Sequence, residues 1–151
     1  MPVRFDRWSV IIVAAQGRLD VVATPIGNLG DLAPRVRESL AAAEELAKEG
    51  ISVEVVDPRT LVPLDRDAIR NSVRKTGRLV VADEAGPVCG ASAEVAAVVT
   101  EDRATFRALK APVSRVCALE APIPYTPILE TAVFPNRDRI AAAVRDIVRE
   151  K

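Results

Sequence analysis

The hydrophobic pattern of the chain alternates between short apolar runs and longer stretches with a helical repeat. Runs rich in Val and Ile, which are typical of buried strands, occupy residues 9–15, 19–24, 51–56, 78–82 and 113–118. Stretches with an apolar residue every three or four positions, which are typical of amphipathic helices, occupy residues 32–47, 65–75, 91–100 and 137–149. Strands separated by helices predict right-handed crossovers and a sheet covered by helices on both faces.

The first two apolar runs are separated only by Gln16, Gly17 and Arg18. Because a break this short cannot hold a crossover helix, the two runs are expected to form an antiparallel hairpin, with the first run at a sheet edge. The Pro-rich residues 122–127 cannot form a central strand. The predicted fold is therefore α/β, a three-layer α/β/α sandwich with a mixed five-stranded sheet, mostly parallel, with one antiparallel edge strand.

Length and composition favour one globular domain spanning residues 1–151. Of the residues, 49% are hydrophobic and 28% are charged, which is the balance of a folded protein. The 21 basic residues cancel the 21 acidic ones, so the basic surface expected of a nucleic-acid-binding protein is missing. The apolar run 10–15 is too short to span a membrane or serve as a signal peptide, and we expect a cytoplasmic protein with no membrane partner.

The chain contains no histidine and only two cysteines, Cys89 and Cys117. A zinc site or a Cys-His catalytic pair therefore lacks its residues, and no metal site is predicted. Two buried thiols are the favoured interpretation, since free cysteine is among the most buried residue types. Acid-base catalysis would need a carboxylate or lysine with a strongly shifted pKa.

From Leu40 onward, several separated segments follow one another in a familiar order: LAAAEELAKEGISVEVVDPRTLVPLD, VRKTGRLVVADEA, CGASAEVAA, APVSRV, PIPYTPILE and FPNRDRIAAAV. This order resembles the C-terminal domain of the beta subunit of pyruvate and branched-chain 2-oxo acid dehydrogenases, which is related to the last domain of transketolase. The resemblance implies the same three-layer fold. It also implies a role in subunit assembly and in contacts with the acyltransferase core, with thiamine diphosphate bound between other domains.

Residues 17–39, GRLDVVATPIGNLGDLAPRVRES, resemble a different family. They are similar to the first strand, loop and helix of tetrapyrrole-methylase-class ribosomal RNA methyltransferases, where this segment opens the domain that binds S-adenosylmethionine. Both families run strand, glycine-containing turn and helix here, so one segment can replace the other without changing topology. The two resemblances together suggest an engineered chimera, with a natural hybrid as the alternative.

Ligands of open α/β sheets bind at the carboxyl ends of the strands, and three loops qualify. The first is a candidate cofactor-binding loop made of Thr24, Pro25, Ile26, Gly27, Asn28, Leu29, Gly30 and Asp31. It could receive a carboxylate, a phosphate or the methionine end of S-adenosylmethionine at the following helix N-terminus. A plain turn, with Asp31 capping that helix, is favoured. The other loops contain Asp57, Arg59 and Thr60, and the pair Asp83 and Glu84; for both we favour a structural role.

The function expected from these observations is a structural or assembly domain without catalysis, that is, not an enzyme. Apolar residues around 122–134 are expected to be exposed and to drive formation of a homo-oligomer, most simply a dimer. The alternative is a binding module with weak affinity for S-adenosylmethionine or a nucleotide at residues 24–31. An active RNA methyltransferase is disfavoured because the later motifs of that family and a basic surface are missing.

Overall fold

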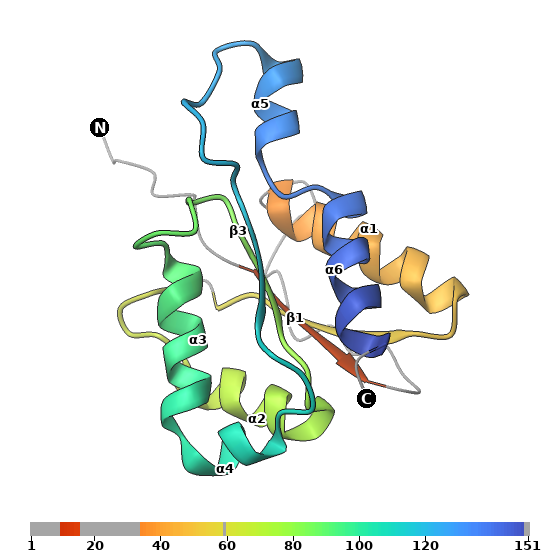
Figure 1. Cartoon of the computed structure of the whole chain (residues 1–151), viewed down its shortest axis with the longest axis vertical. Helices are drawn as coiled ribbons and strands as arrows, with labels where there is room; N and C mark the ends of the chain where they lie inside the picture. The colour runs from red at the N-terminus through yellow and green to blue at the C-terminus, as the bar shows by residue number, and fades with distance from the viewer. Residues whose placement is uncertain (1–9, 16–33, 59, 150–151) are drawn as a thin grey trace.

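The protein is described by a computed structural model covering residues 10–15, 34–58 and 60–149. Figure 1 shows its elements in chain order. They are β1 (Val10–Ala15), α1 (Pro34–Lys48), β2 (Ser52–Val56), α2 (Arg66–Thr76), β3 (Val80–Asp83), α3 (Ala91–Glu101), α4 (Arg103–Ala108), β4 (Ser114–Cys117), α5 (Pro127–Val133) and α6 (Arg137–Arg149). No helix among these residues is long and apolar enough to cross a membrane.

The described strands form a mixed four-stranded sheet in the order β2-β1-β3-β4. Strand β1 is antiparallel to both β2 and β3, whereas β3 and β4 are parallel. The prediction of a mixed sheet with one antiparallel strand is therefore confirmed. The predicted position of that strand is wrong, because β1 lies inside the sheet and not at its edge. The predicted strand at residues 19–24, and with it a five-stranded sheet, lies outside the described residues.

The position of β1 inside the sheet has a physical reason in its composition. Its six residues, VIIVAA, are apolar at every position, and continuous apolar runs are typical of strands covered on both faces. Edge strands usually alternate or carry charges. A short turn after a strand permits a hairpin, but it does not dictate which neighbours the strand finally pairs with.

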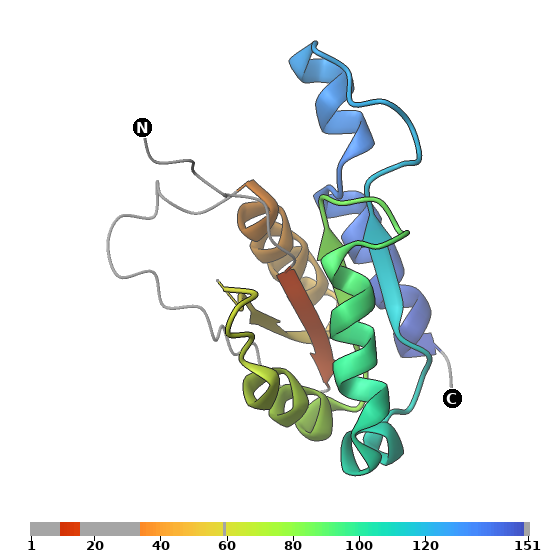
Figure 2. The same ribbon diagram turned by 90° about the vertical axis from the view of Figure 1, so that its left-hand side faces the viewer.

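Two apolar clusters fill the spaces on the two sides of the sheet. Alternate residues of the strands point to opposite faces: Val53, Val55, Val80 and Ala82 pack with α1 and α6, whereas Val56, Leu79 and Val81 pack with α2 and α3. Figure 2 shows the helices on either side of the strands. The predicted three-layer arrangement is thus confirmed for the described residues.

The helix boundaries follow local sequence signals. Asp65 caps α2 by accepting a hydrogen bond from the Ala68 N–H, and Gly77 ends the helix with φ of 80°. Asp102 separates α3 from α4 and caps α4 through the Thr105 N–H. The helix predicted at residues 91–100 is therefore confirmed as α3, and a second, short helix follows it. Helix α5, which begins at Pro127, was not predicted, although proline favours the first turn of a helix.

Candidate functional site

The candidate cofactor-binding loop, residues 24–31, lies outside the described residues, so its role stays a prediction. The turn after β2 is described except for Arg59, which lies outside the described residues together with its predicted role, and the turn includes Thr60. The Thr60 hydroxyl donates to the Pro63 carbonyl oxygen at 2.7 Å, so this side chain satisfies the local backbone as predicted. Among the residues that the structure describes, no three Cys, Asp or Glu side chains gather as metal ligands.

Asp83 lies at the end of β3 and is buried, with 3% of its surface exposed. One carboxylate oxygen accepts the Ser92 N–H at 2.7 Å and the other accepts the Ala85 N–H at 3.0 Å. Ser92 belongs to the first turn of α3, whose free N–H groups and positive dipole end stabilise a carboxylate. Asp83 therefore joins β3 to α3, which supports the structural interpretation of this acidic residue.

The loop between β3 and α3 is tightly packed against its neighbours. A methyl group on Gly90 would lie 2.6 Å from the Gly86 carbonyl oxygen and 3.0 Å from an Asp83 carboxylate oxygen. Arg115 of β4 donates to the Pro87 carbonyl oxygen at 2.8 Å. The loop is thus held in place by close contacts to its backbone.

The two cysteines have different environments. Cys117 is buried, and its sulfur lies 3.4 Å from the Ser92 hydroxyl. Cys89 is exposed and has a positive φ of 57°. The prediction of two buried thiols is therefore correct for Cys117 and wrong for Cys89, because the turn that carries Cys89 directs it to the surface.

A segment that we call the arm, residues 119–133, stands away from the layered body in Figures 1 and 2. It contains α5 and the loop that leads into it. Its large apolar side chains are exposed, with Tyr125 fully accessible and Ile128 85% accessible. The others are Leu119, Ile123 and Leu129. Exposed apolar side chains gathered on one projecting segment are typical of an interaction surface.

The two ends of the arm meet at the body of the domain. The Leu119 N–H donates to the Val133 carbonyl oxygen at 3.0 Å. The Arg139 guanidinium, from the first turn of α6, donates to the carbonyl oxygens of Cys117, Val133 and Phe134. This role of Arg139 was not predicted from the sequence, because its acceptors are backbone carbonyl groups, which no residue pattern reveals.

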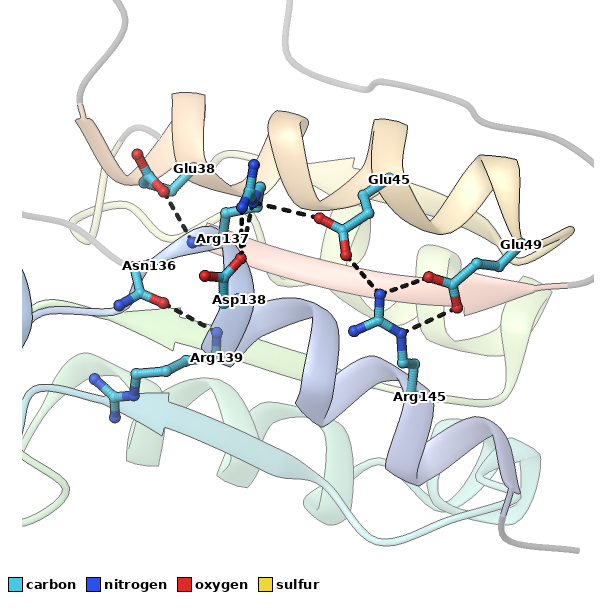
Figure 3. A network of polar contacts seen from close by, with 8 residues as sticks. All are labelled: Glu38, Glu45, Glu49, Asn136, Arg137, Asp138, Arg139 and Arg145. Carbon is cyan, nitrogen blue, oxygen red and sulfur yellow. Dashed lines mark hydrogen bonds and ion pairs between the residues drawn. The ribbon is translucent and has the colours of Figure 1, made fainter.

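An ion-pair network connects α1 to α6 (Figure 3). Arg145 binds both carboxylate oxygens of Glu49, at 2.5 and 3.0 Å, and also Glu45 at 2.6 Å. The hydrogen bond from Arg145, with its positive charge, lowers the pKa of Glu49 below its ordinary value. These contacts lie between the two helices in Figure 3 and connect them.

Comparison with known proteins identifies the class and then the family. The three-layer fold is shared with a solved structure, "Split gene transketolase, inactive beta4 tetramer", at a TM-score of 0.61 and 28% identity over 76% of this chain and 35% of the other. Residues 32–140 match the family "Transketolase, C-terminal domain". The chain belongs to this family.

Curated relatives agree with this assignment. The acetoin:2,6-dichlorophenolindophenol oxidoreductase subunit beta of Cupriavidus necator is 46% identical over 76% of this chain, and that of Bacillus subtilis is 40% identical over 77%. The mitochondrial pyruvate dehydrogenase E1 component subunit beta-1 of Arabidopsis thaliana is 45% identical over 75%. The chain spans about a third of the length of these relatives, namely 33%, 33% and 31%.

These relatives contradict the prediction about enzyme activity and give no support to the predicted chimera. The prediction that the chain is not an enzyme is wrong, because its relatives are beta subunits of oxidoreductases and dehydrogenases. The resemblance of residues 17–39 to a methyltransferase, and the chimera that it suggested, are supported by none of these similarities. The family match begins only at residue 32, and residues 16–33 are not described.

Proposed function

We propose that this chain is the C-terminal assembly domain of a dehydrogenase-type beta subunit, and that its arm joins it to a second copy of the same chain. The observation that carries the proposal is the exposure of five large apolar side chains on the arm. Covering a side chain of this size contributes about 1.5–3 kcal/mol. Several such side chains together favour association strongly enough to offset part of its entropic cost.

The relatives support a second copy as the partner. The solved relative is a tetramer of beta subunits, and this domain corresponds to part of such a subunit. A contact between identical chains around a twofold axis pairs the same surface with itself. Exposed apolar side chains such as Tyr125 and Ile128 suit this arrangement, because an apolar surface complements itself while a charged surface repels itself. A dimer is the smallest assembly that this contact predicts.

Sedimentation velocity over a series of protein concentrations tests the proposal. The wild-type chain is expected to associate, whereas the double variant Tyr125→Ser, Ile128→Ser is expected to sediment as a monomer with an unchanged circular dichroism spectrum. The matched control is Val62→Ser, which removes an exposed apolar side chain from the loop between β2 and α2. A wild-type chain that stays monomeric would contradict the proposal, as would a Val62→Ser variant that dissociates as readily as the arm variant.

A ligand role for residues 24–31 stays a prediction. These residues lie outside the described part of the chain, and the family match begins after them, at residue 32. Calorimetric titration with S-adenosylmethionine is the direct measurement for it.

A further inference from the structure

The base of the arm is organised around one side chain, Arg139. Its Nη2 atom donates to the carbonyl oxygen of Cys117, the last residue of β4, at 2.7 Å. Its Nη1 atom donates to the carbonyl oxygens of Phe134 at 3.1 Å and Val133 at 3.3 Å. One guanidinium thus connects the point where the chain leaves the sheet to the point where it returns from α5.

The chemistry of these contacts suits a rigid joint. Val133 and Phe134 lie at the C-terminal end of α5, where helix carbonyl groups lack intrahelical partners and the dipole favours a cation. The guanidinium is planar and presents several N–H donors in fixed directions. It therefore fixes both the distance and the relative direction of the two ends, which a single hydrogen bond cannot do.

Arg139 is itself held by the body of the domain. Its backbone N–H donates to the Asn136 side-chain oxygen at 3.0 Å (Figure 3), and the following residue, Ile140, is fully buried in the apolar cluster with α1. The side chain is partly buried, so its hydrogen bonds are less exposed to competing water. The contacts to the base of the arm are thus made by a side chain of α6, a helix that is itself packed against the core of the domain.

We propose that Arg139 is the positioning residue of the arm: it sets the direction in which α5 leaves the domain and so presents Tyr125 and Ile128 to a second copy of the chain. The second half of this inference rests on the proposed function, whereas the first half concerns the isolated domain. An arm that is already positioned loses less conformational freedom on association, which strengthens binding without adding a contact.

Amide hydrogen exchange read by mass spectrometry, on wild-type chain and three variants, separates these effects. Arg139→Met removes all the donors, and Arg139→Lys keeps the positive charge and some of the donors. Arg145→Met is the control, because this arginine of the same helix binds Glu45 and Glu49, which are not part of the arm. In Arg139→Met, amides in peptides spanning 118–134 are expected to exchange about tenfold faster or more, since hydrogen bonds to charged groups are being lost. Arg139→Lys is expected to restore part of the protection, and Arg145→Met is expected to leave these peptides unchanged.

Self-association of the same variants is then measured by sedimentation. Arg139→Met is expected to weaken association about tenfold although every apolar contact residue is retained. Unchanged exchange of peptides 118–134 in Arg139→Met would overturn the proposal. Equal acceleration of all peptides, including those of α2 and α3, in both Arg139 variants would also overturn it, because Arg139 would then support the whole fold. If the wild-type chain does not associate, only the proposed function is contradicted. The hydrogen-exchange result still tests whether Arg139 positions the arm.

Discussion

Several charged side chains of this domain serve backbone groups rather than a ligand. Asp83 accepts two N–H groups at the start of α3 and its loop. Arg139 donates to three carbonyl oxygens at the base of the arm. Backbone groups without a partner are costly to bury, so such residues are needed wherever helices and strands end inside the fold. At the scale of residues, these charged side chains therefore connect the ends of strands to neighbouring helices and loops.

The packing around Gly90 gives a prediction at this scale. Its φ of −78° and ψ of 162° suit any residue, so only space forbids a side chain. Gly90→Ala is expected to lower the free energy of unfolding by about 1–3 kcal/mol, because its methyl group would overlap the Gly86 carbonyl oxygen. Urea unfolding measures this loss. The matched control is Gly86→Ala, where nothing lies within 4 Å and a change within about 0.5 kcal/mol is expected.

A second variant separates overlap from helix capping. Gly90 is the N-cap of α3, and alanine is a poorer N-cap than glycine, whereas serine is a good one. Gly90→Ser is nevertheless expected to be destabilised, since it adds the same Cβ atom. Wild-type stability in Gly90→Ser would show that capping, not crowding, explains the effect.

The role of a residue could be predicted only where the sequence around that residue indicates it. The structural role of Asp83 was predicted because side chains of adjacent residues such as Asp83 and Glu84 usually point apart, and because the DEA sequence belongs to the dehydrogenase-like segments. The exposure of Cys89 was not predicted, because free cysteines are usually buried. Only the geometry of its turn places this side chain at the surface. The role of Arg139 depends on carbonyl oxygens of Cys117 and Phe134, and every residue type offers the same carbonyl.

At the scale of elements, the helical repeat predicted α1, α2, α3 and α6 at the observed places. The order of the strands in the sheet was harder to predict, because an apolar run identifies a strand but not the strands that pair with it. Strand β1 pairs with β2 and β3, which lie far along the chain. Helix α5 was not predicted, because most of its apolar residues face solvent, with only Val133 buried, and several prolines lie in its segment. Neither a burial pattern nor the composition therefore indicated a helix.

The junction of α2, α3 and α4 gives a prediction about pH. Asp102 accepts hydrogen bonds from the Thr105 hydroxyl and N–H, and from Arg74 of α2. The hydrogen bonds from Thr105, then that from Arg74, hold the pKa of Asp102 well below its usual range. A carboxyl with a depressed folded-state pKa stabilises the fold above its unfolded-state pKa of about 3.9, and that contribution is lost as the pH falls further.

Asp102→Asn keeps a side-chain oxygen for capping and removes the charge. The variant is therefore expected to unfold at lower urea concentration than wild type at neutral pH, with the difference shrinking as the pH falls below about 4. Urea midpoints between neutral and acidic pH measure this. Glu101→Gln, at the exposed end of α3, is the control for loss of a carboxylate nearby. A difference that grows in acid would contradict the assignment of charge stabilisation to Asp102.

At the scale of the whole molecule, the described chain separates into a body and an arm. The body has an apolar cluster on each face of its sheet, so it holds the core of an independent domain. The arm adds exposed apolar side chains but no part of either cluster. The elements of the body could be predicted because burial leaves a periodic pattern of apolar residues in the sequence. The exposed apolar segment was expected from the family resemblance. Helix α5 and the contacts of Arg139 at the base of the arm were not predicted.

This separation predicts how salt affects association. Charged residues of the whole chain cancel, 21 against 21, and the contact residues of the arm are apolar, so screening of charges should matter little. Raising NaCl from about 0.05 M to about 0.5 M, which shortens the screening length severalfold, is expected to leave the dissociation constant unchanged within a few-fold. Sulfate is expected to strengthen association, because it favours burial of apolar surface. Sedimentation in both salts measures this, and dissociation by NaCl would instead indicate that charged residues of the body form the contact.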